Sequence, residues 1–259
     1  MRILEFGRTA ASMEVVVPTA SVDGHWFQTC LRSIQQSTWD DVHVVAVEDS
    51  GPSFRFPKSA NAGIRRTTKD VLLLNDDTRL APNALEELLR ARKKHGEGAY
   101  QMYVHDSDGR PFEIGWWCDY SFWAPVRYAV RLVAPFATFR KLITGTFLPF
   151  FPYDVPRDGF HGFTFSASLL TRSVIERVDL LDENFPLGLE DFDYSLRCHL
   201  LGVPYYSVPK SIVYHQKAGT RQRGDALEME SRRRFREKWP RRALADALRR
   251  GPSGKVAWT

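Results

Sequence analysis

The sequence of 259 residues predicts an α/β fold with a mostly parallel central sheet flanked by helices. Short apolar runs rich in Val, Ile and Leu alternate with segments of helical periodicity, which is the pattern of right-handed β-α-β units. Acidic or histidine side chains follow four such runs, and in parallel sheets ligands bind at the carboxyl ends of the strands. These four runs with their polar ends are Val44–Asp49, Val71–Asp77, Pro186–Asp191 and Ser211–His215.

Strands and helices are expected to alternate in the first third of the chain. Apolar side chains from Trp26 to Ile34 recur at helical spacing, and Leu85 to Leu89 give another apolar stripe. Pro82 stands where the first turn of that later helix is expected. The expected elements are strands at 14–17, 43–47 and 71–74, and helices at 26–34, 60–67 and after Pro82.

The second half of the chain carries weaker signals. Asp106–Arg110 contains an Asp-Gly pair and predicts a hairpin turn between strands at 100–104 and 112–114. Ser173 and Glu176 have the spacing of a capping box, and Gly202 ends a helix that begins at Asp191. Further strands are expected at 163–170, 205–208 and 212–215, with an irregular aromatic segment at 116–153 and a helical Arg-rich tail.

Length, cysteine content and charge predict one domain with a basic extension. The chain is long enough to bury a core without disulfides, and its three cysteines are far apart, which indicates buried thiols in a reducing compartment. No signal peptide and no run of about 18 apolar residues is present, so a cytoplasmic protein is expected. Residues 221–259 hold 12 Lys and Arg against 5 Asp and Glu, a net charge of +7. The whole chain has a net charge of +5, which leaves −2 for residues 1–220. We therefore expect a domain at 1–220, with an aromatic insert at 116–157, and a basic helical extension at 221–259.

The polar ends of two strands have the chemistry of a metal site. Asp77 offers a carboxylate oxygen, and hard divalent cations such as Mg²⁺ combine carboxylates with substrate phosphates. His215 offers an imidazole nitrogen, which suits Mn²⁺ better than Ca²⁺. A divalent cation there would neutralise a diphosphate leaving group. The alternative is that Asn75-Asp76-Asp77-Thr78 is a polar turn that caps the next helix and that His215 is structural.

Two further acidic pairs have both a functional and a structural interpretation. Glu190-Asp191 opens a helix, where carboxylates are favoured by the helix dipole, and either residue also suits a general base for an acceptor hydroxyl. Glu48-Asp49 precedes Ser50-Gly51 and either accepts hydrogen bonds from a nucleobase or ribose or forms an ordinary turn.

Eight short segments occur in a fixed order between about residues 13 and 220. They are Val15–Thr19, Val47–Ser50, Asn61–Ile64, Leu72–Thr78, Leu181–Phe185, Glu190–Arg197, Gly202 and Val213–His215. Each is weak singly, but the ordered set resembles the family-two glycosyltransferases of GT-A fold, in particular their rhamnosyltransferase-like and galactofuranosyltransferase-like bacterial branch. Asn75, Thr67-Thr68 and Val178-Asp179 depart from residues common in that family, and these departures bear on the subfamily more than on the activity.

This resemblance implies an inverting, metal-dependent transferase that moves a sugar from a nucleoside-diphosphate sugar, of uridine or thymidine type, to a hydroxyl of a glycan or lipid-linked acceptor. It implies Mn²⁺ or Mg²⁺ on Asp77 and His215, and Asp191 as the base, with Glu190 beside it. The residues implied to bind the nucleotide sugar are Thr19, Asp49, Asn61, Asn75 and Asp76.

Other functions compete with the transferase. Residues 18–24 contain no Gly-x-Gly-x-x-Gly and the chain has no P-loop, which argues against a dinucleotide or P-loop site. A sugar nucleotidyltransferase would need a Gly-rich, Arg-containing loop after the first strand, and none is present. Arg232–Arg234 with Arg241-Arg242 would suit nucleic acid, but the tail lacks regular stacking aromatics. A pseudoenzyme is disfavoured by the complete set of acids.

The aromatic insert offers a surface for an anionic membrane. Trp123 and Phe150 belong to a segment rich in aromatic residues. Basic residues, among them Arg127, Arg131 and Arg140, lie between these aromatics, a pattern found at membrane interfaces. The basic extension would add attraction to anionic lipid. The alternative is that these aromatics complete the core and line the acceptor cleft.

Overall fold

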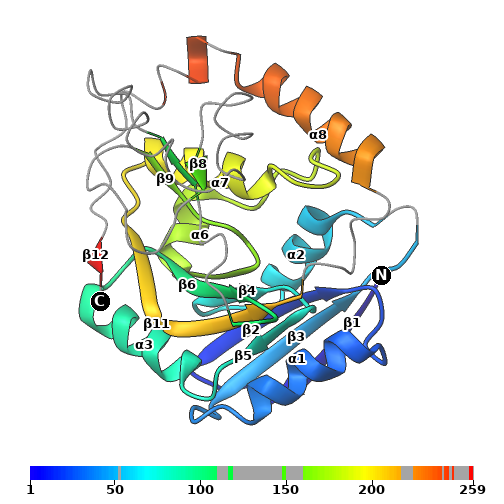
Figure 1. Ribbon diagram of the computed structural model, residues 1–259, viewed down its shortest axis with the longest axis vertical. Helices are drawn as coiled ribbons and strands as arrows, with labels where there is room; N and C mark the ends of the chain where they lie inside the picture. Colours follow the sequence, from blue (N-terminus) through cyan, green and yellow to red (C-terminus); the bar gives the residue numbers. More distant parts are fainter. Residues whose placement is uncertain are drawn as a thin grey trace.

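The computed structural model describes residues 1–51, 54–109, 116–118, 148–149, 160–216, 224–240, 242–244, 247 and 257–258. It confirms an α/β fold with a mixed, largely parallel sheet flanked by helices (Figure 1). The strands of the main sheet run in the order β1-β3-β2-β4-β10-β6-β11-β12, and β5 pairs with β11. Their bounds are β1 (Arg2–Gly7), β2 (Met13–Thr19), β3 (Val42–Glu48), β4 (Val71–Leu74), β5 (Thr78–Leu80), β6 (Ala99–Asp106), β10 (Ala167–Leu170), β11 (Tyr205–His215) and β12 (Ala257–Trp258).

Six helices of the described chain surround this sheet or lie beside it (Figure 1). They are α1 (His25–Gln35), α2 (Phe56–Ile64), α3 (Ala84–His95), α6 (Arg172–Val178), α7 (Glu190–Leu200) and α8 (Gly224–Lys238). Strands β3, β2 and β4 are parallel neighbours, as the β-α-β pattern predicts, and β6 is parallel to β11.

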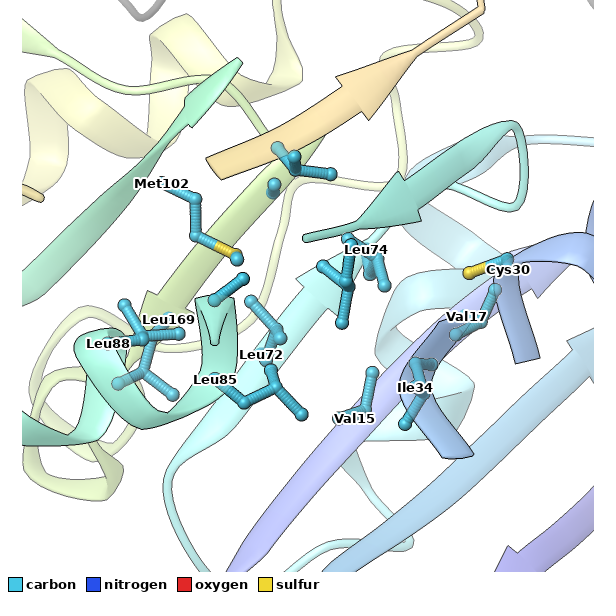
Figure 2. Close-up of a cluster of buried hydrophobic side chains, with 14 of the residues drawn as sticks. Val15, Val17, Cys30, Ile34, Leu72, Leu74, Leu85, Leu88, Met102 and Leu169 are labelled. Carbon is cyan, nitrogen blue, oxygen red and sulfur yellow. The ribbon is translucent and has the colours of Figure 1, made fainter. Parts of the chain in front are cut away.

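One face of the sheet packs against α1 and α3. Side chains of a strand alternate between the two faces, so Val15 and Val17 of β2 belong to this layer and Val16 to the opposite one. Leu72 and Leu74 of β4 lie in the same layer, between the two helices (Figure 2). Each of these leucines is fully buried, which stabilises the fold by roughly 1.5–3 kcal/mol per side chain.

The opposite face packs against α2, α6 and α7. Ala60 and Ile64 of α2, Ile175 of α6 and Tyr194 of α7 join Val16 in this second cluster. Gly63 lets α2 lie close to β2, because a Cβ atom there would lie 2.4 Å from Val16 Cγ1. The segment that contains Asn61 and Gly63 is therefore packed closely against Val16 of β2 and Val47 of β3.

Several elements differ from the sequence-based expectation. Strands β1 and β5 were not predicted, and β1, β5 and β10 each pair antiparallel with their neighbours. The two late strands are one strand, β11, whose register shifts between Val208 and Ile212. The predicted capping box of Ser173 and Glu176 is wrong, because α6 begins at Arg172 and its N-cap residue is Thr171. The hydroxyl of Ser173 donates to Glu97 Oε2 instead. The second strand of the predicted hairpin lies outside the described residues.

The predicted insert is described only in part. Three short strands, β7 (Trp116–Cys118), β8 (Leu148–Pro149) and β9 (Phe160–Gly162), form a small antiparallel sheet in the order β8-β7-β9. Strands β7 and β8 lie within the segment 116–153 that was expected to be irregular, so the expectation is wrong for these two pieces, and β9 follows the insert. The membrane-facing aromatics predicted there lie outside the described side chains. Over the part of the chain that is described, no helix is both long and apolar enough to cross a membrane.

Candidate active site

Thr19 and Asp76 meet at the carboxyl ends of β2 and β4. The Thr19 hydroxyl donates a hydrogen bond of 2.7 Å to Asp76 Oδ2, and it accepts one from the amide of Ser21. Burial raises the pKa of Asp76 above its usual value, and the charge of Asp77 acts in the same direction, against the hydrogen bond from Thr19. Two residues predicted to bind a nucleotide sugar thus lie in contact at one point of the sheet edge.

Asp77 and His215 are also brought together, by the pairing of β5 with β11. Thr78 lies opposite His215 in that antiparallel pair, and the amide of Gln216 donates to the Asp77 carbonyl at 2.9 Å. The side chains then face each other, with His215 Nε2 3.0 Å from Asp77 Oδ1. The sequence predicted that these two residues share a site, and the structure places them side by side.

The Asp77–His215 pair offers a carboxylate oxygen and an imidazole nitrogen, two donor types that divalent cations accept. Their separation of 3.0 Å is that of a direct contact between the two side chains, and adjacent ligands of an octahedral ion bound at about 2.1 Å would also lie about 3.0 Å apart. Among the residues described, no group of three or more His, Cys, Asp or Glu side chains has the arrangement of a metal site. A cation at this pair would therefore depend on phosphate oxygens of a ligand, as Mg²⁺ and Mn²⁺ commonly do.

Asp49 continues the polar edge at the end of β3. It is buried, and its Oδ2 accepts a hydrogen bond of 3.2 Å from Ser59 Oγ of α2. Its amide donates to the Thr19 carbonyl at 2.9 Å, which ties the ends of β3 and β2 together. The neighbouring Glu48 is engaged with protein groups, because it accepts hydrogen bonds from the amide of Val22 and from Arg2.

Asn75 and Asn61 have structural contacts that the sequence did not predict. The backbone N–H of Asn75 donates to the Ser166 carbonyl at 3.1 Å, and the backbone carbonyl of Asn75 accepts a hydrogen bond from the Thr78 hydroxyl. Asn61 is buried, and both hydrogens of its side-chain amide are donated to protein, to the Leu181 carbonyl and to Glu183 Oε1. In this structure Asn61 joins α2 to the Leu181–Glu183 segment.

Glu190 and Asp191 project from a strained turn at the start of α7. Leu189 is the N-cap residue and has a φ of 70°, a left-handed conformation that is unfavourable for a residue with a side chain. Gly188 before it has a φ of 77°. Such strain persists only where surrounding contacts fix the backbone, and it is concentrated at functional sites.

One four-residue segment links this turn to the strand ends. Ser195 of α7 accepts a hydrogen bond from the Phe163 amide and donates one of 2.8 Å to the Asp191 carbonyl. Three residues further along, the Ser166 carbonyl accepts from Asn75. Because three residues of extended chain span at most about 11 Å, the first turns of α7 and the tip of β4 are anchored close to each other.

The carboxyl group of Glu190 is an unusual buried acid. It is 9% exposed, and within the described part of the chain its Oε2 atom has no hydrogen-bond partner. Burial, with the charge of Asp191 next in importance, raises the pKa of Glu190 to about 8. Glu190 is therefore mostly protonated at neutral pH, which makes it a weaker base than an ionised carboxylate in the same place.

This raised pKa predicts a loss of stability with rising pH. Above about pH 4.5 the unfolded chain loses the Glu190 proton, while the folded chain keeps it up to about pH 8. The folded state then binds the extra proton, so the free energy of unfolding falls by up to about 1.4 kcal/mol per pH unit across this interval. Glu190→Gln cannot ionise, and the variant should lack this component. Urea unfolding of both proteins at several pH values measures the difference, and parallel profiles would contradict the assignment.

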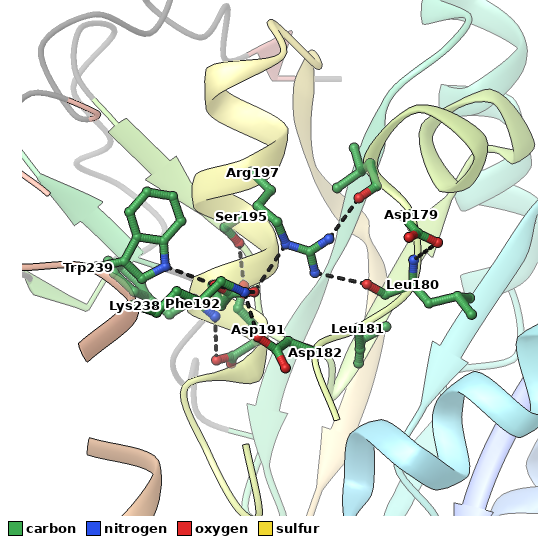
Figure 3. A network of polar contacts seen from close by, with 12 residues as sticks. Asp179, Leu180, Leu181, Asp182, Asp191, Phe192, Ser195, Arg197, Lys238 and Trp239 are labelled. Atoms are coloured by element: carbon green, nitrogen blue, oxygen red, sulfur yellow. Dashed lines mark hydrogen bonds and ion pairs between the residues drawn. The ribbon is translucent and has the colours of Figure 1, made fainter. Parts of the chain in front are cut away.

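A buried polar network behind Asp191 was missed in the sequence (Figure 3). Its centre is Asp193, which is fully buried and accepts hydrogen bonds from Arg197, Lys238 and Trp239. Arg197 also donates to the carbonyls of Val178 and Leu180. The spacing of Asp193 and Arg197, one helical turn apart, is the only signal in the sequence that pointed to this network.

Comparisons with known proteins support the fold. No family model matches the chain, and no curated protein matches it. Among solved structures it is similar to the crystal structure of GalNAc-T7 with UDP, GalNAc and Mn²⁺, with a TM-score of 0.58 and 12% sequence identity. The match covers 91% of this chain and 49% of that one, so the chain spans about half the length of the structure it matches. The chain has the α/β fold of a GT-A glycosyltransferase.

Proposed function

We propose that the protein is a metal-dependent glycosyltransferase that moves a sugar from a nucleoside-diphosphate sugar to an acceptor hydroxyl with inversion. The observation that supports the proposal is that two kinds of group are tied to one edge of the sheet. Asp77 and His215 lie 3.0 Å apart there, and the α7 turn that bears Glu190 and Asp191 is anchored to the same Phe163–Ser166 segment as the tip of β4.

The donor would be held by the strand-end residues. Asp49, Thr19 and Asp76 offer carboxylate and hydroxyl groups for the nucleoside and sugar, and Asn75 lies between the end of β4 and Asp76. Asp77 and His215 would hold Mn²⁺ or Mg²⁺, and the bound ion would supply positive charge for the diphosphate. The presence of UDP and Mn²⁺ in the GalNAc-T7 crystal supports a uridine-type donor, with a thymidine-type donor as the alternative.

The transfer would be a single displacement. The acceptor oxygen forms a bond to the anomeric carbon while the bond from that carbon to the diphosphate oxygen breaks, and the acceptor proton passes to Asp191. The nucleoside diphosphate takes the electron pair of the broken bond. Base catalysis of this kind contributes about 10²–10⁴-fold to the rate. The acceptor would be a hydroxyl of a glycan or of a lipid-linked sugar.

A donor screen tests this function. Purified protein is incubated with uridine, thymidine and guanosine diphosphate sugars in Mn²⁺ or Mg²⁺, and release of the nucleoside diphosphate is measured with and without glycan acceptors. We expect one donor to be consumed in a metal-dependent manner. NMR of the product then reports the anomeric configuration, and retention of the donor configuration would contradict the proposed displacement.

The nucleic-acid alternative loses support from the charges on α8. Arg232, Arg233 and Arg234 form ion pairs of 2.5–2.8 Å with glutamates of the same helix, at positions 228, 230 and 237. These arginines are exposed, but their charges are balanced locally rather than presented together to a phosphate backbone.

A further inference from the structure

Helix α8 packs on the segment that carries the proposed base. Phe235 of α8 and Trp239 just after it join Phe185, Leu189 and Phe192 in an apolar cluster separate from the two main cores. The ring of Phe235 lies 5.2 Å from that of Phe192, between centroids. Helix α8, near the start of the basic region 221–259, thus packs against the first turns of α7 through its apolar residues.

Polar contacts reinforce this packing around one buried carboxylate. Trp239 Nε1 donates a hydrogen bond of 2.8 Å to Asp193 Oδ1, and Lys238 Nζ lies 2.9 Å from the same oxygen. Lys238 also donates to Asp182 Oδ2 at 2.6 Å (Figure 3). Arg197 donates to Asp193 Oδ2 from the other side, at 3.1 Å. A buried carboxylate is stable only with such a set of charged and hydrogen-bonded partners, so removal of one partner weakens the whole arrangement.

A third set of contacts holds the turn before Glu190. The Ser231 hydroxyl of α8 is fully buried and accepts a hydrogen bond of 3.0 Å from the Leu187 amide. Leu189, with its strained left-handed backbone, packs against the apolar cluster that contains Phe235. Ser231 and Phe235 of α8 therefore contribute to the contacts that keep this turn in its strained conformation.

We propose that α8 and Trp239 position the proposed base, by fixing the Leu187–Asp191 turn through Ser231, Phe235 and the Asp193 network. This inference rests on the proposed function of Asp191. Asp193, Lys238 and Trp239 are positioning residues, because they act through the first turn of α7. Helix α8 and Trp239 are then a structural part of the proposed active site.

The residues proposed to bind the donor are held by contacts that do not involve α8. Thr19, Asp49, Asp77 and His215 lie at the ends of β2, β3, β4 and β11, and their hydrogen bonds and ion pairs described above involve no residue of α8. A loss of the α8 contacts should therefore change the turnover of the bound donor more than its binding.

The test uses Trp239→Phe, which keeps an aromatic ring and removes the indole donor, and Lys238→Met, which keeps the chain length and removes the charge. Arg233→Met is the matched control on α8, because Arg233 makes only exposed ion pairs among the described contacts. In the two test variants we expect kcat to fall at least tenfold, while the affinity for UDP in Mn²⁺, measured by calorimetry, stays within twofold. The control should match the wild type in both. Lys238→Arg, which keeps the charge, should recover most of the activity of Lys238→Met.

Amide hydrogen exchange gives a second measurement that does not depend on activity. Peptides covering residues 187–192 should exchange faster in Trp239→Phe and Lys238→Met than in the wild type and the control, and peptides of β2 and β4 should be unchanged. Unchanged exchange at 187–192 would overturn the inference, as would equal losses of kcat and of UDP affinity. If no donor supports transfer by the wild type, the proposed function fails, while exchange at 187–192 still decides whether α8 fixes the turn.

Discussion

Asp191→Asn should lower the rate of sugar transfer by about two to four orders of magnitude. The substitution preserves the shape of the side chain and removes its ability to take a proton. It also preserves an oxygen for the hydrogen bond that Asp191 Oδ1 accepts from the Phe192 amide at 2.7 Å, so the start of α7 should keep its geometry. The measurement is single-turnover transfer with the donor identified in the screen.

Donor binding separates a chemical role of Asp191 from a structural one. We expect the affinity of Asp191→Asn for the nucleoside diphosphate in Mn²⁺ to stay close to that of the wild type, because the base faces the acceptor. Asp40→Asn is a suitable control, since Asp40 is exposed and lies just before β3, at the opposite end of that strand from Asp49. Loss of donor binding by a folded Asp191→Asn protein would move this residue to another role.

Near-normal transfer by Asp191→Asn would instead point to Glu190. The buried position of Glu190 argues against that outcome, because its raised pKa of about 8 leaves most of it protonated at neutral pH. If Glu190 were the base, the rate would rise with pH up to about 8, and Glu190→Gln would remove that dependence. The two variants together therefore distinguish the two neighbouring acids.

The sequence predicts the fold best where local pattern and tertiary packing agree. The strand expected at 71–74 has the bounds of β4, and the helix expected to begin at Asp191 begins at Glu190. The first is a continuous apolar run that ends at Asn75-Asp76-Asp77, and the second begins with an acidic pair and ends just before Gly202. Strand β1 was missed because Arg2–Gly7 contains no apolar run and is partly exposed. These residues form a strand because they pair with the edge of β3.

Strand direction and strand continuity lie beyond the reach of periodicity. An apolar run such as Ala167–Leu170 has the same pattern whichever way it pairs, so the antiparallel placement of β10 could not be predicted. The strands expected at 205–208 and 212–215 form one strand, β11, because the sheet accommodates the residues between them, Pro209 included, at a register shift.

The candidate site shows the same division between local and long-range information. Polar residues at strand ends are expected to converge at a sheet edge, and Asp77 and His215 do lie together. The antiparallel pairing of β5 with β11 that brings them into contact was not predicted. The contacts of Asn61 with residues 181 and 183 depend on how two distant segments dock, and no local pattern encodes them. The partners of Asp193 at positions 238 and 239 were hidden for the same reason.

Asp77→Ala and His215→Ala should each remove most of the transfer activity. Each variant deletes one of the two donor atoms that lie 3.0 Å apart, and a cation with two protein ligands loses half of them. The affinity for UDP should fall sharply in Mn²⁺ and change little in EDTA, because the protein contacts to the nucleoside remain. Calorimetry with and without Mn²⁺ measures both affinities, and Asp40→Ala serves as the control for a change of charge.

Stability must be measured in the same variants. The Asp77 and His215 side chains are only 11% and 16% exposed, so each substitution is expected to cost on the order of 1–2 kcal/mol of unfolding free energy. A loss of that size leaves a domain with a core of two helix-covered layers folded, and urea unfolding verifies it. Full activity in EDTA, or in either variant, would contradict a metal at this pair. A variant that loses UDP affinity equally with and without Mn²⁺ would do so too, because the side chain would then contact the nucleotide directly.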